Sequence, residues 1–432
     1  MSITKFLGIQ NLPDSGQSLF RKYTFISIFG AFFGNLSSTF FILFAIDEIG
    51  YVQASYTISF MLLTQLIFDY PSGSLGDWIG QKWVLTISML SNAVFFYLLT
   101  QAGTFNVFLI LAFFGGFANA QASGTLETWL DNNYKLVIGT FDLDRKVYGF
   151  GMSRINSLNR IIMAFSFLLG GYIATNFSRR SVFIVQASFS LLLIIFILLL
   201  VNDVASEHTE KKKPSTIEYF HFFTGGLKFL FTNKTAFFFL IGTSLIFGSF
   251  TVWGNLILFP IYFGYSGSDD LASIFRTIMF LIGIPISVYM ARISQKFQSE
   301  RVSFFYLTGT LFYYIPFIFL LTVIPLPNSL NLIGLVISAL ILTFSNNFLL
   351  DVGETLRLRT MIDLIPSENR NAVYSLIPSL VSIISIPLLP ITGELIARFE
   401  MNFGVIIPLV ISFIGSIFMV ISLKLSKKNS ND

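Results

Sequence analysis

The sequence is poor in the residues on which disulfide, metal and nucleotide chemistry depend. It has no cysteine and only two histidines, His208 and His221, among 432 residues. The absence of cysteine excludes disulfide scaffolds, thiolate metal sites and iron–sulfur clusters, and two histidines are too few for a histidine-rich metal or haem site. No Gly-Lys dipeptide occurs, which excludes a phosphate-binding loop of the Gly-x-x-x-x-Gly-Lys-Ser/Thr type. We therefore expect no cofactor, no metal and no nucleotide.

Charge is scarce as well, and long apolar runs take its place. Asp, Glu, Lys and Arg make up 12% of the chain, about half the share in soluble domains, while 54% of the residues are hydrophobic. Because a helix needs about 20 mostly apolar residues to cross a bilayer, the runs predict an all-α polytopic membrane protein with twelve transmembrane helices in two six-helix bundles. The predicted spans are 23–45, 52–74, 83–102, 105–129, 147–174, 181–201, 235–262, 270–291, 302–324, 330–350, 371–396 and 403–424.

The basic residues predict the orientation. With both termini in the cytoplasm, only Arg179, Arg180 and Arg398 of the 27 Lys and Arg fall in outer loops, and three more lie within spans. This asymmetry follows the positive-inside rule, so we predict a multi-pass protein of the cell membrane, surrounded by lipid, with both termini cytoplasmic. Topology accounts for the basic residues, and no nucleic-acid partner is expected.

A connector over 202–234 divides the chain into predicted halves 1–201 and 235–432. The connector begins polar and continues as a Phe-rich amphipathic stretch, which we expect to lie along the membrane surface; a partner-binding role is the alternative. Residues 79–83 (IGQKW) and 293–297 (ISQKF) form a short match at equivalent loops. The match indicates duplication of a six-helix half, as in transporters built from repeats.

The loop after the second predicted span resembles the signature of the major facilitator superfamily of secondary transporters. That signature has a Gly, an Asp four residues later, a second Gly and then a basic residue, and here these are Gly73, Asp77, Gly80 and Lys82. The preceding segment 69–72 (DYPS) is similar to a common variant of the same signature. Glycines at these positions allow helix ends to approach closely.

A second resemblance precedes the eleventh predicted span. Its members are Arg359, Asp363, Ile365, Pro366, Arg370 and Ser375, which are similar to a pattern that many members of the family carry. The resemblance implies two bundles that alternate in access, with Asp77 latching the cytoplasmic side in the outward-open state and Lys82 as a supporting cation. The equivalent of Asp77 in the second half is Ala291, so the second latch is degenerate.

Two features differ from the proton-coupled drug antiporters of this family. Residues 109–116 contain no basic residue where those proteins carry an Arg in the fourth span. Ser166-Phe167 stands where those proteins have a Gly-Pro pair before paired glycines. Both differences count against drug/proton antiport.

Arg160 is the clearest charged residue within a span, near the middle of the fifth. At 100° per residue, Ser153, Asn156, Asn159 and Arg160 share one face of a helix. Because a charge in a span costs about 2.5–3.5 kcal/mol on insertion scales, such a residue usually faces protein or a water-filled cavity. We interpret Arg160 as a cavity residue that binds an anionic or polar group of the solute; a structural ion pair is the alternative.

Other polar residues predict gates and a coupling site. Arg154 is placed to pair with Glu127, and Arg276 with Glu394 at the outer side, unless Arg276 and Glu394 reach the headgroups instead. Asp69 is a candidate proton-coupling carboxylate, or else a member of a motif ion pair. The predicted gate and motif residues are Gly73, Asp77, Gly80, Lys82, Glu127, Asp131, Asp351, Glu354 and Arg370. The predicted cavity residues are Asn35, Asp69, Arg154, Asn156, Asn159, Arg160, Arg276 and Asn346.

These features together predict a secondary transporter and not an enzyme. A membrane enzyme would need His or carboxylates clustered at one bilayer face, whereas the candidates here are dispersed over several spans. We expect a monomer that exports a small organic solute by alternating access, with proton antiport as its coupling. Uptake or facilitated transport of an anionic solute bound by Arg160 is the alternative.

Overall fold

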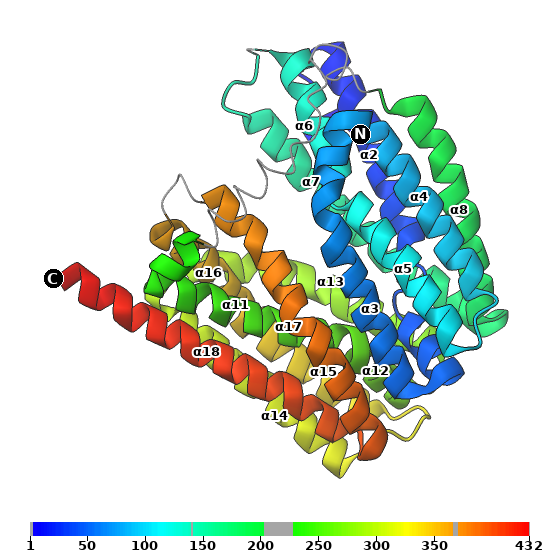
Figure 1. Ribbon diagram of the computed structural model, residues 1–432, viewed down its shortest axis with the longest axis vertical. Coiled ribbons are helices and arrows are strands. Elements are labelled where there is room, and N and C mark those ends of the chain that lie inside the picture. The colour runs from blue at the N-terminus through cyan, green and yellow to red at the C-terminus, as the bar shows by residue number, and fades with distance from the viewer. Residues whose placement is uncertain (1–2, 140, 203–227, 366–369, 432) are drawn as a thin grey trace. The chain divides into compact units, whose positions relative to one another are not determined.

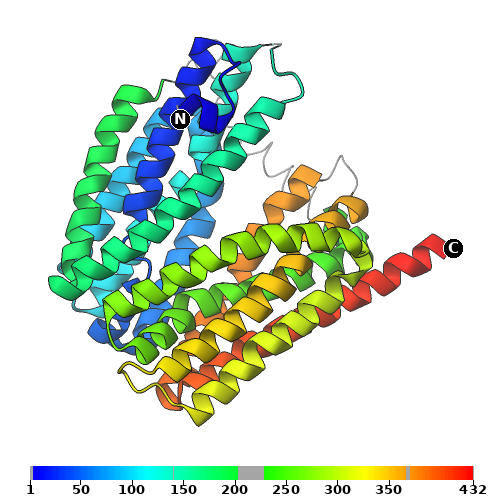
Figure 2. The same ribbon diagram turned by 180° about the vertical axis from the view of Figure 1, so that it is seen from behind.

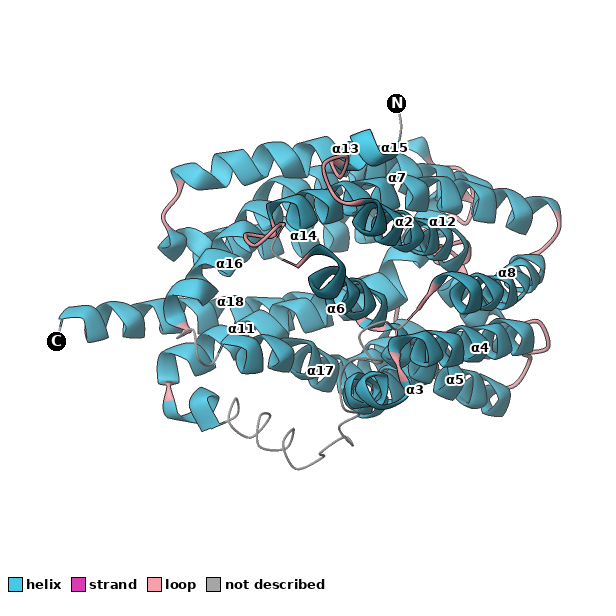
Figure 3. Ribbon diagram, turned by 90° about the horizontal axis from the view of Figure 1, so that it is seen from above, coloured by secondary structure: helices cyan, strands magenta, loops and turns pink. Residues whose placement is uncertain are grey.

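The computed structural model describes residues 3–139, 141–202, 228–365 and 370–431; within these ranges the side chains of residues 70–74, 77, 370–372, 375 and 428–431 are left out. Every regular element in the described part is a helix (Figure 3). The chain divides into two compact units. Unit 1 comprises Met1–Thr39 and Phe60–Ser215, and unit 2 comprises Phe40–Ser59 and Thr216–Asp432.

The helices of the first part of the chain are α1 (Ile3–Leu7), α2 (Asp14–Gly34), α3 (Phe41–Ile79), α4 (Gln81–Leu99), α5 (Phe105–Ala122), α6 (Thr125–Ile138), α7 (Lys146–Asn176) and α8 (Arg179–Leu200). Those of the second part are α11 (Lys234–Val252), η1 (Trp253–Ile257), α12 (Leu258–Ser266), α13 (Asp269–Ile293), η2 (Ser294–Lys296), η3 (Ser299–Arg301), α14 (Val302–Val323), α15 (Leu332–Ile341), η4 (Leu342–Leu350), α16 (Asp351–Leu364), α17 (Arg370–Arg398) and α18 (Met401–Asn431). Ten helical segments in the described residues are long and apolar enough to span a membrane.

The predicted first span, 23–45, is wrong in its boundaries. Helix α2 begins at Asp14 and ends at Gly34, and α3 begins at Phe41. The segment before α2 packs on unit 1, where Leu7, Ile9 and Leu12 are buried in the core. Their burial holds the chain against unit 1 just before α2, which begins at Asp14.

The predicted tenth span, 330–350, is too short. Helices α15, η4 and α16 continue one another from Leu332 to Leu364. Arg357 and Arg359, which the sequence analysis counted in the cytoplasmic loop after this span, therefore lie on a helix.

Unit 1 is held together where α2 ends against α7 and α8. Four carbonyl groups at the end of a helix lack a partner within it. Here Gln186 Nε2 donates to the carbonyls of Phe33 and Gly34 at 3.0 and 3.1 Å, and the Ser166 hydroxyl donates to that of Phe32. Ser166, the first residue of the pair that stands where the drug antiporters have Gly-Pro, thus satisfies a backbone group of α2.

Unit 2 is built around α11 and α18, which lie side by side with α17 in Figure 1. A Cβ atom added at Gly242 would lie 2.6 Å from the Gly415 carbonyl oxygen, and one added at Gly415 would lie equally close to that of Gly242. Small residues allow membrane helices to pack this closely. Figure 2 shows α13, α14 and the α15–η4 segment on the other face of unit 2, where η4 packs against both α13 and α14.

Candidate functional site

Helix α7 of unit 1 presents the predicted polar face. Ser153, Asn156 and Arg160 are exposed, while Ile155 between them is buried. Asn159 turns away from this face, since its Nδ2 atom donates to the Ser27 hydroxyl on α2 at 2.7 Å. The structure therefore brings together three of the four residues that the helical spacing grouped.

Arg160 has no hydrogen bond, ion pair or ring contact with any residue that the structure describes. Its side chain is exposed near the middle of α7. This observation favours the cavity interpretation of Arg160 over a structural ion pair within unit 1. An unneutralised guanidinium at such a position needs water or an anion.

The predicted pair of Arg154 with Glu127 is wrong. The Arg154 guanidinium lies over the rings of Phe6 and Phe150, at 5.6 and 5.0 Å from their centres. Glu127 instead accepts a hydrogen bond from the Tyr23 hydroxyl at 3.4 Å. No spacing or motif in the sequence predicts that Phe6, in the segment before α2, packs on α7 and stacks on Arg154.

Ion pairs in unit 1 gather where α6 leads into α7. Asp131 binds Lys135 at 2.7 Å and Arg145 at 2.6 Å. Asp142, in the turn between the helices, accepts hydrogen bonds from the Tyr134 hydroxyl at 2.7 Å and from the Tyr148 amide at 3.0 Å. Burial acts to raise the pKa of Asp142, but these hydrogen bonds outweigh it and bring the pKa below its ordinary value.

The superfamily signature lies at the end of α3. Gly80 has a φ of 93°, a conformation that favours glycine, and it precedes the first residue of α4. Gly76 is buried against the Gln81 side chain, Lys82 is half-buried, and the Asp69 carboxylate lies beside the Ser123 hydroxyl. The side chains of Asp77 and Arg370, like residues 203–227 of the predicted connector 202–234, lie outside the described part. Gly73 is in a stretch of α3 described by its backbone alone.

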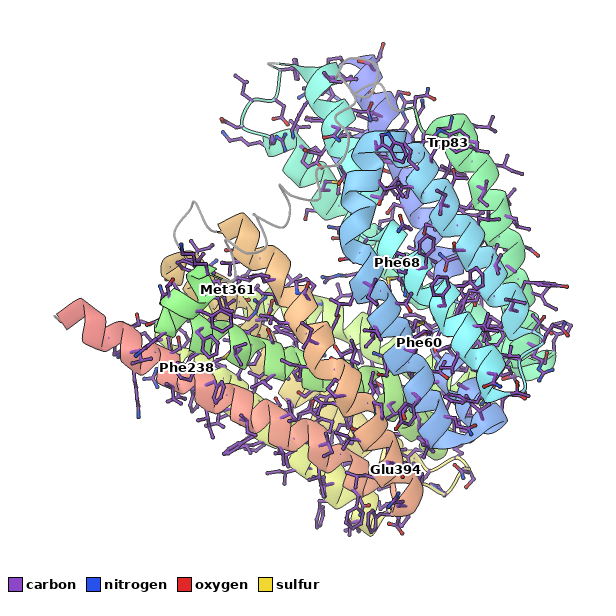
Figure 4. The ribbon with its side chains drawn as sticks, in the orientation of Figure 1. Phe60, Phe68, Trp83, Phe238, Met361 and Glu394 are labelled. Atoms are coloured by element: carbon purple, nitrogen blue, oxygen red, sulfur yellow. The ribbon has the colours of Figure 1, made fainter. Side chains whose placement is uncertain are left out.

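Unit 2 contains a charged cluster on α16. The Arg357 guanidinium makes two hydrogen bonds to the Glu354 carboxylate, Nε to Oε2 at 2.7 Å and Nη2 to Oε1 at 2.5 Å. The Tyr306 hydroxyl on α14 donates to Glu354 Oε2 at 2.7 Å. The guanidinium also lies 5.0 Å from the centre of the Phe247 ring, and its Nη1 atom lies 2.8 Å from the sulfur of Met361, which is labelled on α16 in Figure 4.

A cavity of about 480 Å³ borders this cluster. It lies between α11 and α17, with α16 contributing the two charged residues. Its lining consists of Phe247, Phe250, Thr251, Glu354, Arg357, Ile377, Pro378 and Val381. The site thus combines an apolar and aromatic wall with one charged pair, which is the composition of a small-molecule pocket.

Arg357 and Tyr306 were missed from the sequence. Arg357 was counted in a cytoplasmic loop because the tenth span was ended at residue 350. Continuing the helix would have placed Glu354 and Arg357 one turn apart on the same face. Phe247 and Phe250 are three residues apart, so the helical repeat also places their rings on one face of α11.

The other predicted residues of unit 2 are dispersed. Asp351 accepts a hydrogen bond from the Ser287 hydroxyl on α13, and Asn346 donates to the side chain of Asn347 at 3.1 Å. Arg276 lies over the Phe259 ring at 4.4 Å. Glu394, labelled near the far end of α17 in Figure 4, pairs with Arg398 at 2.5 Å.

Two further placements complete the predicted set. Asn35, at the end of α2, donates to the Ala31 carbonyl of its own helix at 2.8 Å. Arg359 of the second resemblance lies 3.4 Å from the carbonyl oxygens of Ser294 and Phe297. A cation at the carboxyl end of a helical segment complements its dipole, which gives Arg359 a structural role.

The long apolar helices, the glycine-mediated crossings and the polar groups within spans define a polytopic membrane transporter fold. The family model of the Major Facilitator Superfamily matches residues 24–355. The chain belongs to this superfamily, whose members are secondary transporters that work by alternating access and are not enzymes. The predicted all-α, twelve-span fold is confirmed.

Solved structures with the same fold include transporters of different solutes. The chain is similar to the nucleoside transporter NupG, with 15% identity, a TM-score of 0.65 and coverage of 96% of this chain and 98% of that one. The POT family transporter PepTSo matches with 10% identity, a TM-score of 0.70 and coverage of 95% and 98%. A D-xylose-proton symporter matches with 13% identity, a TM-score of 0.63 and coverage of 93% and 97%. No curated protein sequence matches the chain.

Proposed function

We propose that this transporter moves a small organic solute that carries an anionic group, and that Arg160 binds that group. The observation that supports this proposal is an exposed arginine in the middle of a membrane helix with no partner among the described residues. A cation at such a position is costly unless an anion or water compensates it. Asn156, exposed on the same helix face, supplies a neutral hydrogen-bonding group beside the charge.

We also propose that protons drive the transport, with Asp69 as the titrating group. Asp69 lies in α3 beside the Ser123 hydroxyl, and a hydroxyl can donate to an ionised carboxylate or accept from a protonated one. One of the solved structures of similar fold is a proton symporter. Export in exchange for protons and uptake together with protons differ in the sign of the proton flux, so one assay distinguishes them.

Purified protein in proteoliposomes with an internal pH dye tests both proposals. Anionic, neutral and cationic solutes of matched size are added outside, and we expect proton flux with the anionic series. Arg160→Gln should reduce this flux at least tenfold, equivalent to about 1.4 kcal/mol, while Arg160→Lys should retain part of it. Arg398→Gln, which removes an exposed arginine paired with Glu394, is the matched control.

Three results would each contradict one of these two proposals. Wild-type flux in Arg160→Gln would return Arg160 to a structural role. Flux with the cationic series alone would exclude an anionic solute. Movement of labelled anionic solute without proton flux would leave the solute class standing and remove the role of Asp69.

A further inference from the structure

The two charged partners on α16 differ in burial. The Arg357 side chain is 10% exposed, whereas that of Glu354 is 38% exposed, and both line the cavity between α11 and α17. Glu354 can therefore reach water by a change of rotamer, while Arg357 cannot. In this pair the anion is the exchangeable member and the cation is fixed.

The remaining contacts of Arg357 hold it in place without neutralising it. Its guanidinium lies over the Phe247 ring, its Nη1 atom contacts the Met361 sulfur, and the Tyr306 hydroxyl lies beside it. An aromatic face and a thioether are weak acceptors, and a neutral hydroxyl carries no negative charge. If Glu354 leaves or is neutralised, a buried guanidinium keeps its position and lacks an anion, which is unfavourable.

The cavity offers room for a ligand that brings such an anion. Its volume of about 480 Å³ is within the roughly 300–1,000 Å³ of small-molecule sites. Apart from Glu354 and Arg357 its lining is almost wholly apolar, with two aromatic rings from α11 opposite Ile377, Pro378 and Val381 of α17. A ligand that fills it needs an apolar body and one acidic end.

We propose that this cavity binds an amphipathic organic carboxylate whose acidic group replaces that of Glu354 on Arg357. The proposal rests on the anionic solute class proposed above and adds to it an apolar body and a binding site within unit 2. A planar guanidinium binds any carboxylate through two parallel hydrogen bonds, so the solute reproduces the contacts that Glu354 makes. Tyr306, whose hydroxyl donates to Glu354 Oε2, is placed to donate to the incoming carboxylate as well.

In this proposal the Glu354 carboxylate competes with the carboxylate of the solute for the Arg357 guanidinium. Replacing Glu354 by glutamine keeps a hydrogen-bond acceptor for Arg357 but removes the negative charge, so the solute should bind more tightly. A purely structural ion pair predicts the reverse, because its loss would loosen the site. A gain of binding also cannot arise from misfolding.

The test uses the full-length purified protein with 3-phenylpropanoate and, as an uncharged match, 3-phenylpropanol. Binding is measured by titration calorimetry and by the shift in unfolding temperature. We expect the acid to bind at least tenfold more tightly than the alcohol, Glu354→Gln to tighten binding of the acid at least tenfold, and Arg357→Gln to weaken it at least tenfold. Phe247→Ala should weaken binding of the acid and its alcohol alike, and Glu394→Gln, in the exposed pair with Arg398, is the matched control.

Equal affinity for acid and alcohol would overturn the proposal. So would unchanged or weaker binding in Glu354→Gln, or no binding of the acid to that variant at about 10 mM, a concentration tenfold above a Kd of 1 mM. If Arg160→Gln abolishes flux while Glu354→Gln binds as the wild type does, the proposed function stands and this site is excluded. If Glu354→Gln tightens binding while Arg160→Gln transports normally, the site stands and the role of Arg160 is excluded.

Discussion

Arg160 in unit 1 and Arg357 in unit 2 show two ways of keeping an arginine within a membrane span. Arg160 is exposed on α7 and has no partner among the described residues. Arg357 is buried on α16, where a carboxylate, a ring and a sulfur atom surround its guanidinium. The described residues provide no anion for the first cation, whereas the second is paired with a carboxylate on its own helix.

The difference indicates what each residue can do. An exposed, unpaired cation can meet an anion without first breaking a contact, so it suits the initial capture of a solute. A buried, paired cation binds a new anion only by exchange, which makes its occupancy dependent on the partner it already has. Changes to the partner should therefore matter greatly for Arg357, whereas Arg160 has no partner to change among the described residues.

The largest effect is expected from Glu354→Leu. This change leaves the buried Arg357 guanidinium without an anion. Breaking a fully buried pair in this way costs about 3–5 kcal/mol, and the loss here should be smaller because Glu354 is partly exposed. Arg357→Met should cost less, because the Glu354 side chain that remains is 38% exposed and can be hydrated. The measurement is the unfolding temperature of each variant in detergent, followed by intrinsic fluorescence.

The double variant Glu354→Leu/Arg357→Met is the control for this prediction. It removes both charges and should recover most of the stability that Glu354→Leu loses. Equal losses for the two single variants, or a greater loss for Arg357→Met, would show that the burial of the two side chains does not decide the outcome.

The sequence predicted the part of this comparison that depends on helical periodicity. The 3.6-residue repeat placed Arg160 beside Asn156, and the apolar runs located the helices, because both follow from neighbours along one helix. It did not predict the partners of Arg357, since Tyr306 and Phe247 come from two other helices. The tenth span was ended too early for the same reason. Arg357 was assigned to a loop because the two helices that bury it, α11 and α14, could not be identified as its neighbours from the sequence.

An intermediate effect is expected from Asp142→Asn, at the turn where unit 1 keeps its ion pairs. Asp142 accepts hydrogen bonds from two amides at the start of α7, at 3.0 and 3.3 Å, one at each carboxylate oxygen. Asparagine keeps only one acceptor oxygen, so the change should cost about 0.5 kcal/mol, the low end of the cost of losing a helix cap. Because the pKa of Asp142 is lowered in the folded protein, its contribution is complete above the ordinary carboxyl pKa and is lost as the pH falls through the lowered value.

Unfolding temperatures measured from pH 7 down to pH 3 check this prediction. The difference between wild type and Asp142→Asn should be largest at pH 7 and should shrink at acid pH. Asp144→Asn is the matched control two residues away, in an exposed pair with Lys146 that should contribute little. A difference that grows as the pH falls would contradict the assigned cause.

Arg160→Met should have the smallest effect on stability and a large effect on transport. No described contact is lost when the guanidinium is removed, and a charge in a span is unfavourable by itself, so the unfolding temperature should stay the same or rise slightly. Solute-dependent flux should nevertheless fall as it does in Arg160→Gln. A fall in unfolding temperature as large as that of Glu354→Leu would mean that Arg160 has a structural partner, and the contrast between the two arginines would no longer hold.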